Sequence, residues 1–187
     1  MRSIRTSRVA LTAVFVALAA ALGFLLLSVP NVELITFTVF AAGTLLGRSG
    51  GALVGALAFA IFSGFHPMGS GVHYPPGYVA QIGAAALVGL AGGASRALWR
   101  PGRASGRPWV MALVGGAFGF TLTVIFQVLV SAGYAMASPD RTIGLVAALV
   151  SNAVFSAVHV VSNTIVFSAL APAVLPRLQR LRPDGAP

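Results

Sequence analysis

Residues 2–29 read RSIRTSRVALTAVFVALAAALGFLLLSV, in which three arginines precede an apolar run of about 21 residues. Because an α-helix rises 1.5 Å per residue, such a run covers about 30 Å, the thickness of the hydrocarbon core of a bilayer. The run is longer than the apolar core of a typical signal peptide, and further apolar runs follow it. We therefore predict that residues 9–29 form a retained transmembrane helix.

Five more apolar stretches follow, separated by short breaks rich in glycine, proline or arginine. The pattern predicts an all-α integral membrane protein whose six transmembrane helices form a single domain over residues 1–187. The second and third stretches are short, at about 15 residues each. Ser138 is the expected N-cap of the last helix, with Pro139 in its first turn. The expected spans are 9–29, 32–46, 51–65, 77–98, 109–135 and 143–171.

The arginines predict how this bundle is oriented. If the six spans alternate, eleven of the twelve arginines fall on one side of the membrane and only Arg141 on the other. Cytoplasmic loops collect lysine and arginine, so we expect both termini to lie in the cytoplasm.

Composition excludes several classes of protein. Hydrophobic residues make up 57% of the chain and charged residues 8%. In soluble domains about a quarter of the residues are charged. The net charge of +9 comes from arginines at the ends of apolar segments, so no clustered cationic face is expected to bind nucleic acid. The chain has no cysteine, and no carboxylate accompanies the loop histidines His66 and His73, so we expect no metal site. No nucleotide-binding or hydrolase motif is present, so we expect that the chain is not an enzyme and binds no cofactor.

A few polar residues interrupt the apolar spans, and each needs a reason because polar side chains are expensive in lipid. Gln81, Gln127 and Asn152 all fall in the outer halves of their spans, so we expect them to share one outward-facing cavity. His159 and Asn163 follow Asn152 on the same helical face and would continue this polar stripe inward.

Other polar and aromatic residues, His66 among them, are expected around the mouth of that cavity. Each candidate also has a structural interpretation: the amides and His159 could bond across helices, the tyrosines could lie at the membrane interface, and Glu33 could face unpaired amides at a helix N-terminus. The candidate substrate-binding residues are Asn31, Glu33, His73, Tyr74, Tyr78, Gln81, Gln127, Tyr134, Asn152 and His159.

Small residues recur four apart, a spacing that lets helix backbones approach closely in a membrane. For the glycines at 43, 47, 51 and 55 we expect packing inside the bundle. Ala13, Ala17 and Ala21 line one face of the first helix. Two interpretations of this alanine face are open, internal packing and docking onto another membrane protein.

The chain resembles the substrate-binding S component of energy-coupling factor (ECF) vitamin transporters, and its six expected spans and small size fit that family. The residues that carry the resemblance are Pro30-Asn31-Val32-Glu33, Phe40, the glycines at 43, 47, 51 and 55, and the loop from Pro67-Met68-Gly69 to Pro75-Pro76-Gly77. The resemblance implies a vitamin or related micronutrient bound near the outer surface, covered by the first, third and fifth loops and walled by the last three helices.

The resemblance also implies partners. Ala13 and Ala17 match the Ala-x-x-x-Ala face with which the family docks onto a membrane-embedded coupling subunit that carries two cytoplasmic ATPases. It implies a multi-pass protein of the bacterial cytoplasmic membrane. The ligand is open among riboflavin, thiamine, a pyridoxal-like vitamer, a cobalamin precursor and others, and the sparse outer charge favours a neutral or mildly cationic one. The alternative is a small cell-envelope scaffold or assembly protein without a ligand.

Overall fold

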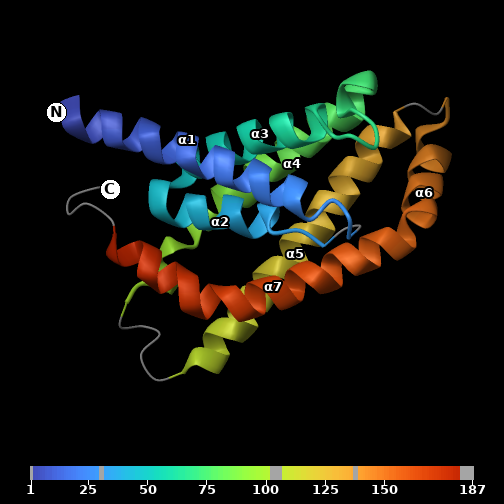
Figure 1. The fold of residues 1–187 in the computed structure, drawn as a ribbon. Helices are drawn as coiled ribbons and strands as arrows, with labels where there is room; N and C mark the ends of the chain where they lie inside the picture. The colour runs from blue at the N-terminus through green and yellow to red at the C-terminus, as the bar shows by residue number, and fades with distance from the viewer. Residues whose placement is uncertain (1, 30–31, 102–106, 137–138, 182–187) are drawn as a thin grey trace.

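The computed structural model describes residues 2–29, 32–101, 107–136 and 139–181, and all regular structure within these ranges is helical (Figure 1). Two short 3-10 helices, η1 (Gly71–His73) and η2 (Arg96–Trp99), join longer elements. The α-helices are α1 (Arg2–Leu25), α2 (Ile35–Leu46), α3 (Arg48–Gly64), α4 (Pro75–Ala94), α5 (Pro108–Ala135), α6 (Arg141–Ser151) and α7 (Ala153–Arg180).

Four helices in the described part of the chain are long and apolar enough to cross a membrane, namely α1, α4, α5 and α7. The chain is therefore an all-helical protein with the character of a multi-pass membrane protein. The helices α2, α3 and α6 are shorter. The count of six spans and the cytoplasmic placement of the termini stay predictions.

The short helix α2 is the centre of the bundle. Every residue from Ile35 to Leu45 is buried, and the helix contacts α1, α3, α4 and α7. Its 12 residues extend over about 18 Å. Because α2 is surrounded by other helices, its length need not match the thickness of the hydrocarbon core.

Close backbone contacts hold α2, α3 and α4 together. A Cβ atom added at Gly89 would lie 2.0 Å from the carbonyl oxygen of Gly51, and one added at Gly43 would lie 2.0 Å from that of Gly89. Gly55 is equally confined, because its Cβ would lie 2.2 Å from the carbonyl oxygen of Ala85. The expected internal packing of the glycine series is confirmed at these positions.

The range 143–171, expected as one span, is divided in the structure. Asn152 separates α6 from α7, and its side-chain Nδ2 donates to the carbonyl oxygen of Ala148, 3.0 Å away. Asparagine competes for local backbone groups in this way, which favours a break. At the other end, α7 continues through Pro172 and Pro176 to Arg180 and does not end at Ala171.

The expected cap of the last span is wrong. The carboxylate of Asp140 accepts hydrogen bonds from the backbone amides of Thr142 and Ile143, at 2.9 and 3.1 Å, so Asp140 is the N-cap of α6. Aspartate is as good a cap as serine, because either supplies an oxygen to the unpaired amides of the first turn. Ser138 lies outside the described residues.

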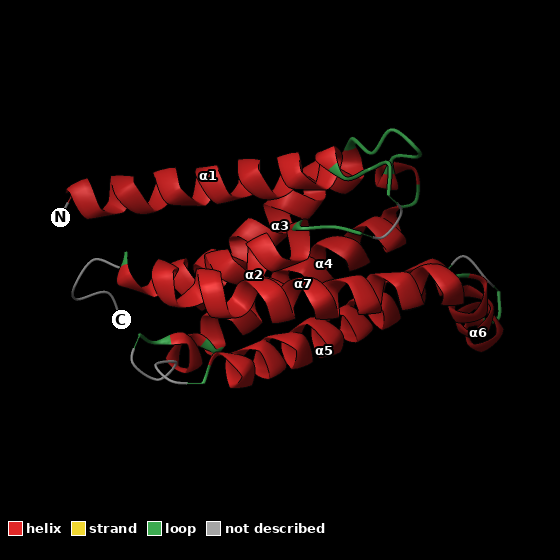
Figure 2. Cartoon of the chain, turned by 60° about the horizontal axis from the view of Figure 1, so that its bottom comes forward, coloured by secondary structure: helices red, strands yellow, loops and turns green. Residues whose placement is uncertain are grey.

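The two ends of the bundle differ in charge. The start of α1, the turn between α2 and α3 and the end of α7 lie at one end, whereas α6 lies at the other (Figures 1 and 2). Arg48, Arg177 and Arg180 belong to the first end, and Arg141 begins α6 at the second. The arrangement agrees with the separation of arginines on which the predicted orientation depends.

We expect Gly89→Ala to destabilise the protein by about 1–3 kcal/mol, because the added methyl group must push apart the backbones of α3 and α4. Gly83→Ala is the matched control in the same helix, since nothing lies within 4 Å of its added Cβ. Thermal unfolding of the detergent-purified variants measures both. Equal stability of the two variants would show that this packing is wrongly placed.

Candidate functional site

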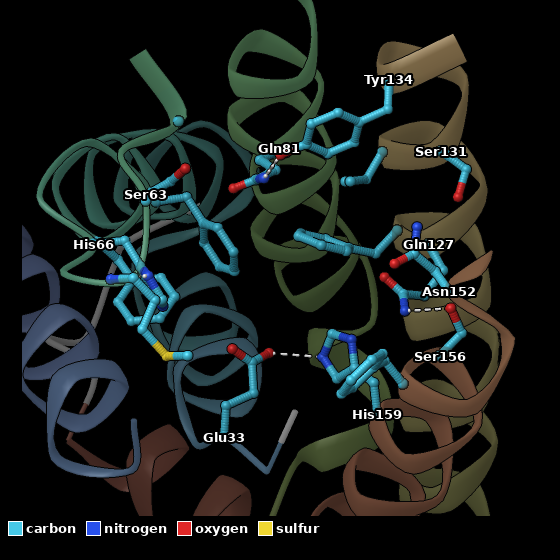
Figure 3. A pocket seen from close by; sticks show the side chains of 18 residues that line it. Glu33, Ser63, His66, Gln81, Gln127, Ser131, Tyr134, Asn152, Ser156 and His159 are labelled. Atoms are coloured by element: carbon cyan, nitrogen blue, oxygen red, sulfur yellow. Dashed lines mark hydrogen bonds and ion pairs between the residues drawn. The ribbon is translucent and has the colours of Figure 1, made fainter. Parts of the chain in front are cut away.

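A hollow of about 390 Å³ lies at the end of the bundle that carries α6. Its walls come from α3, α4, α5 and the start of α7, with the segment before α2 and the loop after α3 (Figure 3). The polar residues that line it are Glu33, Ser63, His66, Gln81, Gln127, Ser131, Tyr134, Asn152, Ser156 and His159.

The structure brings most of the candidate residues together. Gln81, Gln127 and Asn152, expected to share a cavity, all line this hollow, as do Tyr134 and His159. Glu33 lines it too. Asn31 lies outside the described residues.

Three candidates, His73, Tyr74 and Tyr78, are described but do not line the hollow. Tyr78 donates from its hydroxyl to the carbonyl oxygen of Ala60, 2.9 Å away, and so ties α4 to α3. Tyr74 stacks on Tyr134 with ring centres 5.2 Å apart. The hydroxyl of Tyr74 also donates to the carbonyl oxygen of Tyr134 at 3.1 Å. Tyr74 and Tyr78 therefore support the wall of the hollow from behind. His73 is exposed and contacts its own loop, at the carbonyl oxygen of Ser70.

A buried contact between a glutamate and a histidine lies at one side of the hollow. The Nε2 atom of His159 is 3.0 Å from Oε1 of Glu33, and their side chains are 7% and 13% exposed. The hydroxyl of Thr36 donates to the same carboxylate oxygen. The pair joins the segment before α2 to α7, across 126 residues of sequence. Since a buried charge is costly without a partner, these contacts explain how Glu33 is tolerated there.

The three amides bond within the protein and still face the hollow. Gln127 donates to the hydroxyl of Ser156 at 2.8 Å, which links α5 to α7. Gln81 donates to the hydroxyl of Tyr134 at 3.3 Å, which links α4 to α5. The structural and ligand-binding interpretations of these residues are therefore compatible, because each amide has a second polar atom.

Gln127 and Ser156 also border a second space. An apolar groove runs along the outer side of α5, α6 and α7, lined by residues such as Val124, Leu149 and Val160 in addition to Gln127 and Ser156. The hydrogen bond between the two polar side chains therefore lies between the hollow and this groove.

Aromatic rings cover another wall. The ring centres of Phe59 and Phe126 are 5.2 Å apart, and those of Phe126 and His159 are 5.9 Å apart. On the other side, Phe59 contacts Phe62, which in turn contacts His66 edge-on at 5.2 Å. A continuous row of rings thus runs from His66 to His159.

Sequence reasoning missed several lining residues. Ser131 and Ser156 follow Gln127 and Asn152 by four residues, so their place on the same helical faces was a usable signal. The apolar lining residues carried no such signal, because phenylalanine is equally at home against lipid. Those missed are Phe59, Phe62, Ser63, Met68, Gly69, Gly71, Phe126, Val130, Ser131, Phe155 and Ser156.

The polar stripe of α7 ends at His159. Asn163 is fully buried and does not line the hollow, and its Nδ2 donates to the hydroxyl of Thr123 on α5, 3.1 Å away. Asn163 therefore joins α7 to α5 and is not part of the hollow.

The alanine face of α1 is exposed over Ala13, Ala17 and Ala21. Ala13 and Ala17 line an apolar groove together with Leu53 and Leu57 of α3. Among the described residues this face is not packed inside the bundle, which leaves docking as the open interpretation.

The chemistry of the hollow is restricted. None of its lining residues is a lysine or arginine, and no group of three or more metal-ligating side chains occurs among the described residues. No protein-family model, curated protein or solved structure matches the chain. The resemblance to ECF S components therefore depends on the sequence residues quoted for it.

We expect Asn163→Ala to lower the free energy of unfolding by about 1–2 kcal/mol, because it removes a buried hydrogen bond between α5 and α7. Asn152→Ala is the comparison, since Asn152 is exposed and bonds only within its own segment. Thermal or denaturant unfolding in detergent reports the difference. An Asn152→Ala protein as unstable as the Asn163→Ala protein would contradict the assignment.

Proposed function

We propose that this protein is the substrate-capture subunit of an ECF-type importer, which binds a vitamin or related micronutrient in the hollow lined by Gln81, Gln127 and Asn152. The observation that carries the proposal is this convergence of polar side chains on one space. Its volume of about 390 Å³ falls in the range of small-molecule sites, about 300–1,000 Å³. Polar groups are costly in a membrane, so their gathering around a cavity favours a binding role over a purely packing one.

The end of the bundle at which the hollow lies supports capture from outside. The hollow is at the α6 end, and the arginine-bearing turns and helix ends are at the opposite end. If arginines mark the cytoplasmic side, the hollow faces outward and both termini face inward. Under this proposal α2 and α3 form two of six spans; α2 is enclosed by other helices, and α3 packs against α1, α2 and α4.

Delivery would depend on partners. The chain has no nucleotide-binding motif, so energy would come from two cytoplasmic ATPases acting through a membrane-embedded coupling subunit. The exposed face of Ala13, Ala17 and Ala21 is the proposed docking surface, because small residues let a partner helix approach the backbone of α1 closely.

Ligand capture is tested by native mass spectrometry and thermal shift of the full-length protein, purified in detergent and incubated with bacterial small-molecule extract. We expect one small molecule to be retained and to raise Tm. Gln127→Leu should weaken retention about tenfold, because an amide that can pair with the ligand is lost. Ile125→Leu, at an exposed position of the same helix, should leave retention unchanged. A protein that retains nothing would favour the scaffold alternative.

Docking is tested by placing larger side chains on the alanine face of α1. We expect the double substitution Ala13→Leu and Ala17→Leu to abolish co-purification with the coupling subunit and vitamin uptake, while ligand retention by the isolated protein stays normal. Ala117→Leu, at an exposed alanine of α5, is the matched control and should change neither. Uptake that survives the double substitution would show that the partner docks elsewhere.

A further inference from the structure

Each amide nitrogen of the hollow already donates one hydrogen bond within the protein. Nδ2 of Asn152 donates to the carbonyl oxygen of Ala148, and because a carbonyl can only accept, this contact fixes the orientation of the amide. Its Oδ1 is then left as an acceptor. The amide nitrogens of Gln81 and Gln127 also donate to protein hydroxyls, which leaves two more carbonyl oxygens. Each of the three amides therefore has a carbonyl oxygen that can accept from a ligand, beside the one N–H that its nitrogen keeps.

The carboxylate of Glu33 also offers an acceptor to the hollow. Oε1 of Glu33 accepts from both Thr36 and His159, whereas no hydrogen bond to its other carboxylate oxygen occurs within the described residues. That second oxygen is turned away from His159 (Figure 3). No lysine or arginine lines the hollow, so the second oxygen of Glu33 is an acceptor with no such side chain beside it.

An aromatic surface lies next to the contact between Glu33 and His159. Phe126 contacts the ring of His159 at 5.9 Å, His159 contacts Glu33, and Phe59 continues the surface at 5.2 Å from Phe126. Aromatic faces attract cations and stack with flat rings. A carboxylate beside such rings suits a ligand in which a positively charged or N–H-bearing nitrogen is attached to a flat ring.

We propose, building on the capture function above, that the hollow selects a flat heteroaromatic ligand that carries a cationic or N–H-donating nitrogen. The nitrogen donates to the second oxygen of Glu33, and the ring lies against Phe59 and Phe126. The amide oxygens of Asn152 and Gln127 accept from further donors of the ligand.

Other classes of ligand fit this hollow less well. A carboxylate or phosphate would meet no lysine or arginine and would lie close to the carboxylate of Glu33, which makes its desolvation costly. A flat ligand without donors would leave the carboxylate oxygen and the amide oxygens buried and unpaired, which is costly.

The first test compares ligands on the unaltered protein. Binding of the full-length chain is measured by calorimetry for one ring system in three forms: pyridoxamine with an amine, pyridoxine with a hydroxyl, and 4-pyridoxate with a carboxylate. Thiamine, riboflavin and nicotinate extend the comparison to other rings. We expect pyridoxamine, which alone of the three carries an exocyclic ammonium group, to bind at least about tenfold tighter than pyridoxine or 4-pyridoxate.

The outcomes separate the two proposals. If pyridoxamine binds no tighter than pyridoxine or 4-pyridoxate, or if the ligand recovered from extract by native mass spectrometry has no cationic or N–H-bearing nitrogen, the present inference is overturned and the capture function stands. If neither the panel nor the extract yields a ligand, both are overturned.

The second test removes the charge of Glu33. Glu33→Gln keeps an oxygen for Thr36 and His159, and should weaken the nitrogen-bearing ligand about 10- to 100-fold while changing its uncharged counterpart less than about threefold. Asp140→Asn is the matched control, since Asp140 lies at the same end of the bundle but does not line the hollow. Equal loss for both ligands, or no loss for either, would overturn the role of Glu33.

Discussion

The need to pair polar groups inside a bilayer governs this protein. Water is absent from the hydrocarbon core, so each buried polar atom must find a partner in the chain or face a hydrated space. The contact between Glu33 and His159 meets this need across 126 residues of sequence. It holds the segment before α2 against α7, and the hollow forms where the helices around that contact do not fill the space.

The helices of this bundle pack tightly at the glycines and lie further apart around the hollow. Around Gly43, Gly51 and Gly89 the backbones of α2, α3 and α4 touch, leaving no room for a side chain. At the α6 end, the larger side chains of Phe59 and Phe126 hold the helices apart and their rings form a wall. Tight packing at one end thus supplies a rigid frame for an open site at the other, which is the condition for a preformed binding cavity.

The long helices and the place of Gln81, Gln127 and Asn152 could be predicted from sequence, because apolar length and isolated polar residues are strong signals in a membrane. The break at Asn152 could not, since the side-chain bond to Ala148 that accompanies it leaves the apolar pattern unchanged. The burial of α2 was equally invisible, because a helix surrounded by protein and one surrounded by lipid are both apolar. His73, Tyr74 and Tyr78 were expected at the cavity and are not there, since the bracing of Tyr134 by Tyr74 depends on which tyrosine faces inward.

The hydrogen bond from Gln127 to Ser156 has a consequence for how the membrane itself acts on the site. These two side chains border both the hollow and the apolar groove on the outer side of α5 and α7. In that place the partition between the hollow and the groove is a single layer of side chains. The thickness and fluidity of a surrounding bilayer would bear directly on this partition, so the shape of the hollow is expected to differ from one bilayer to another.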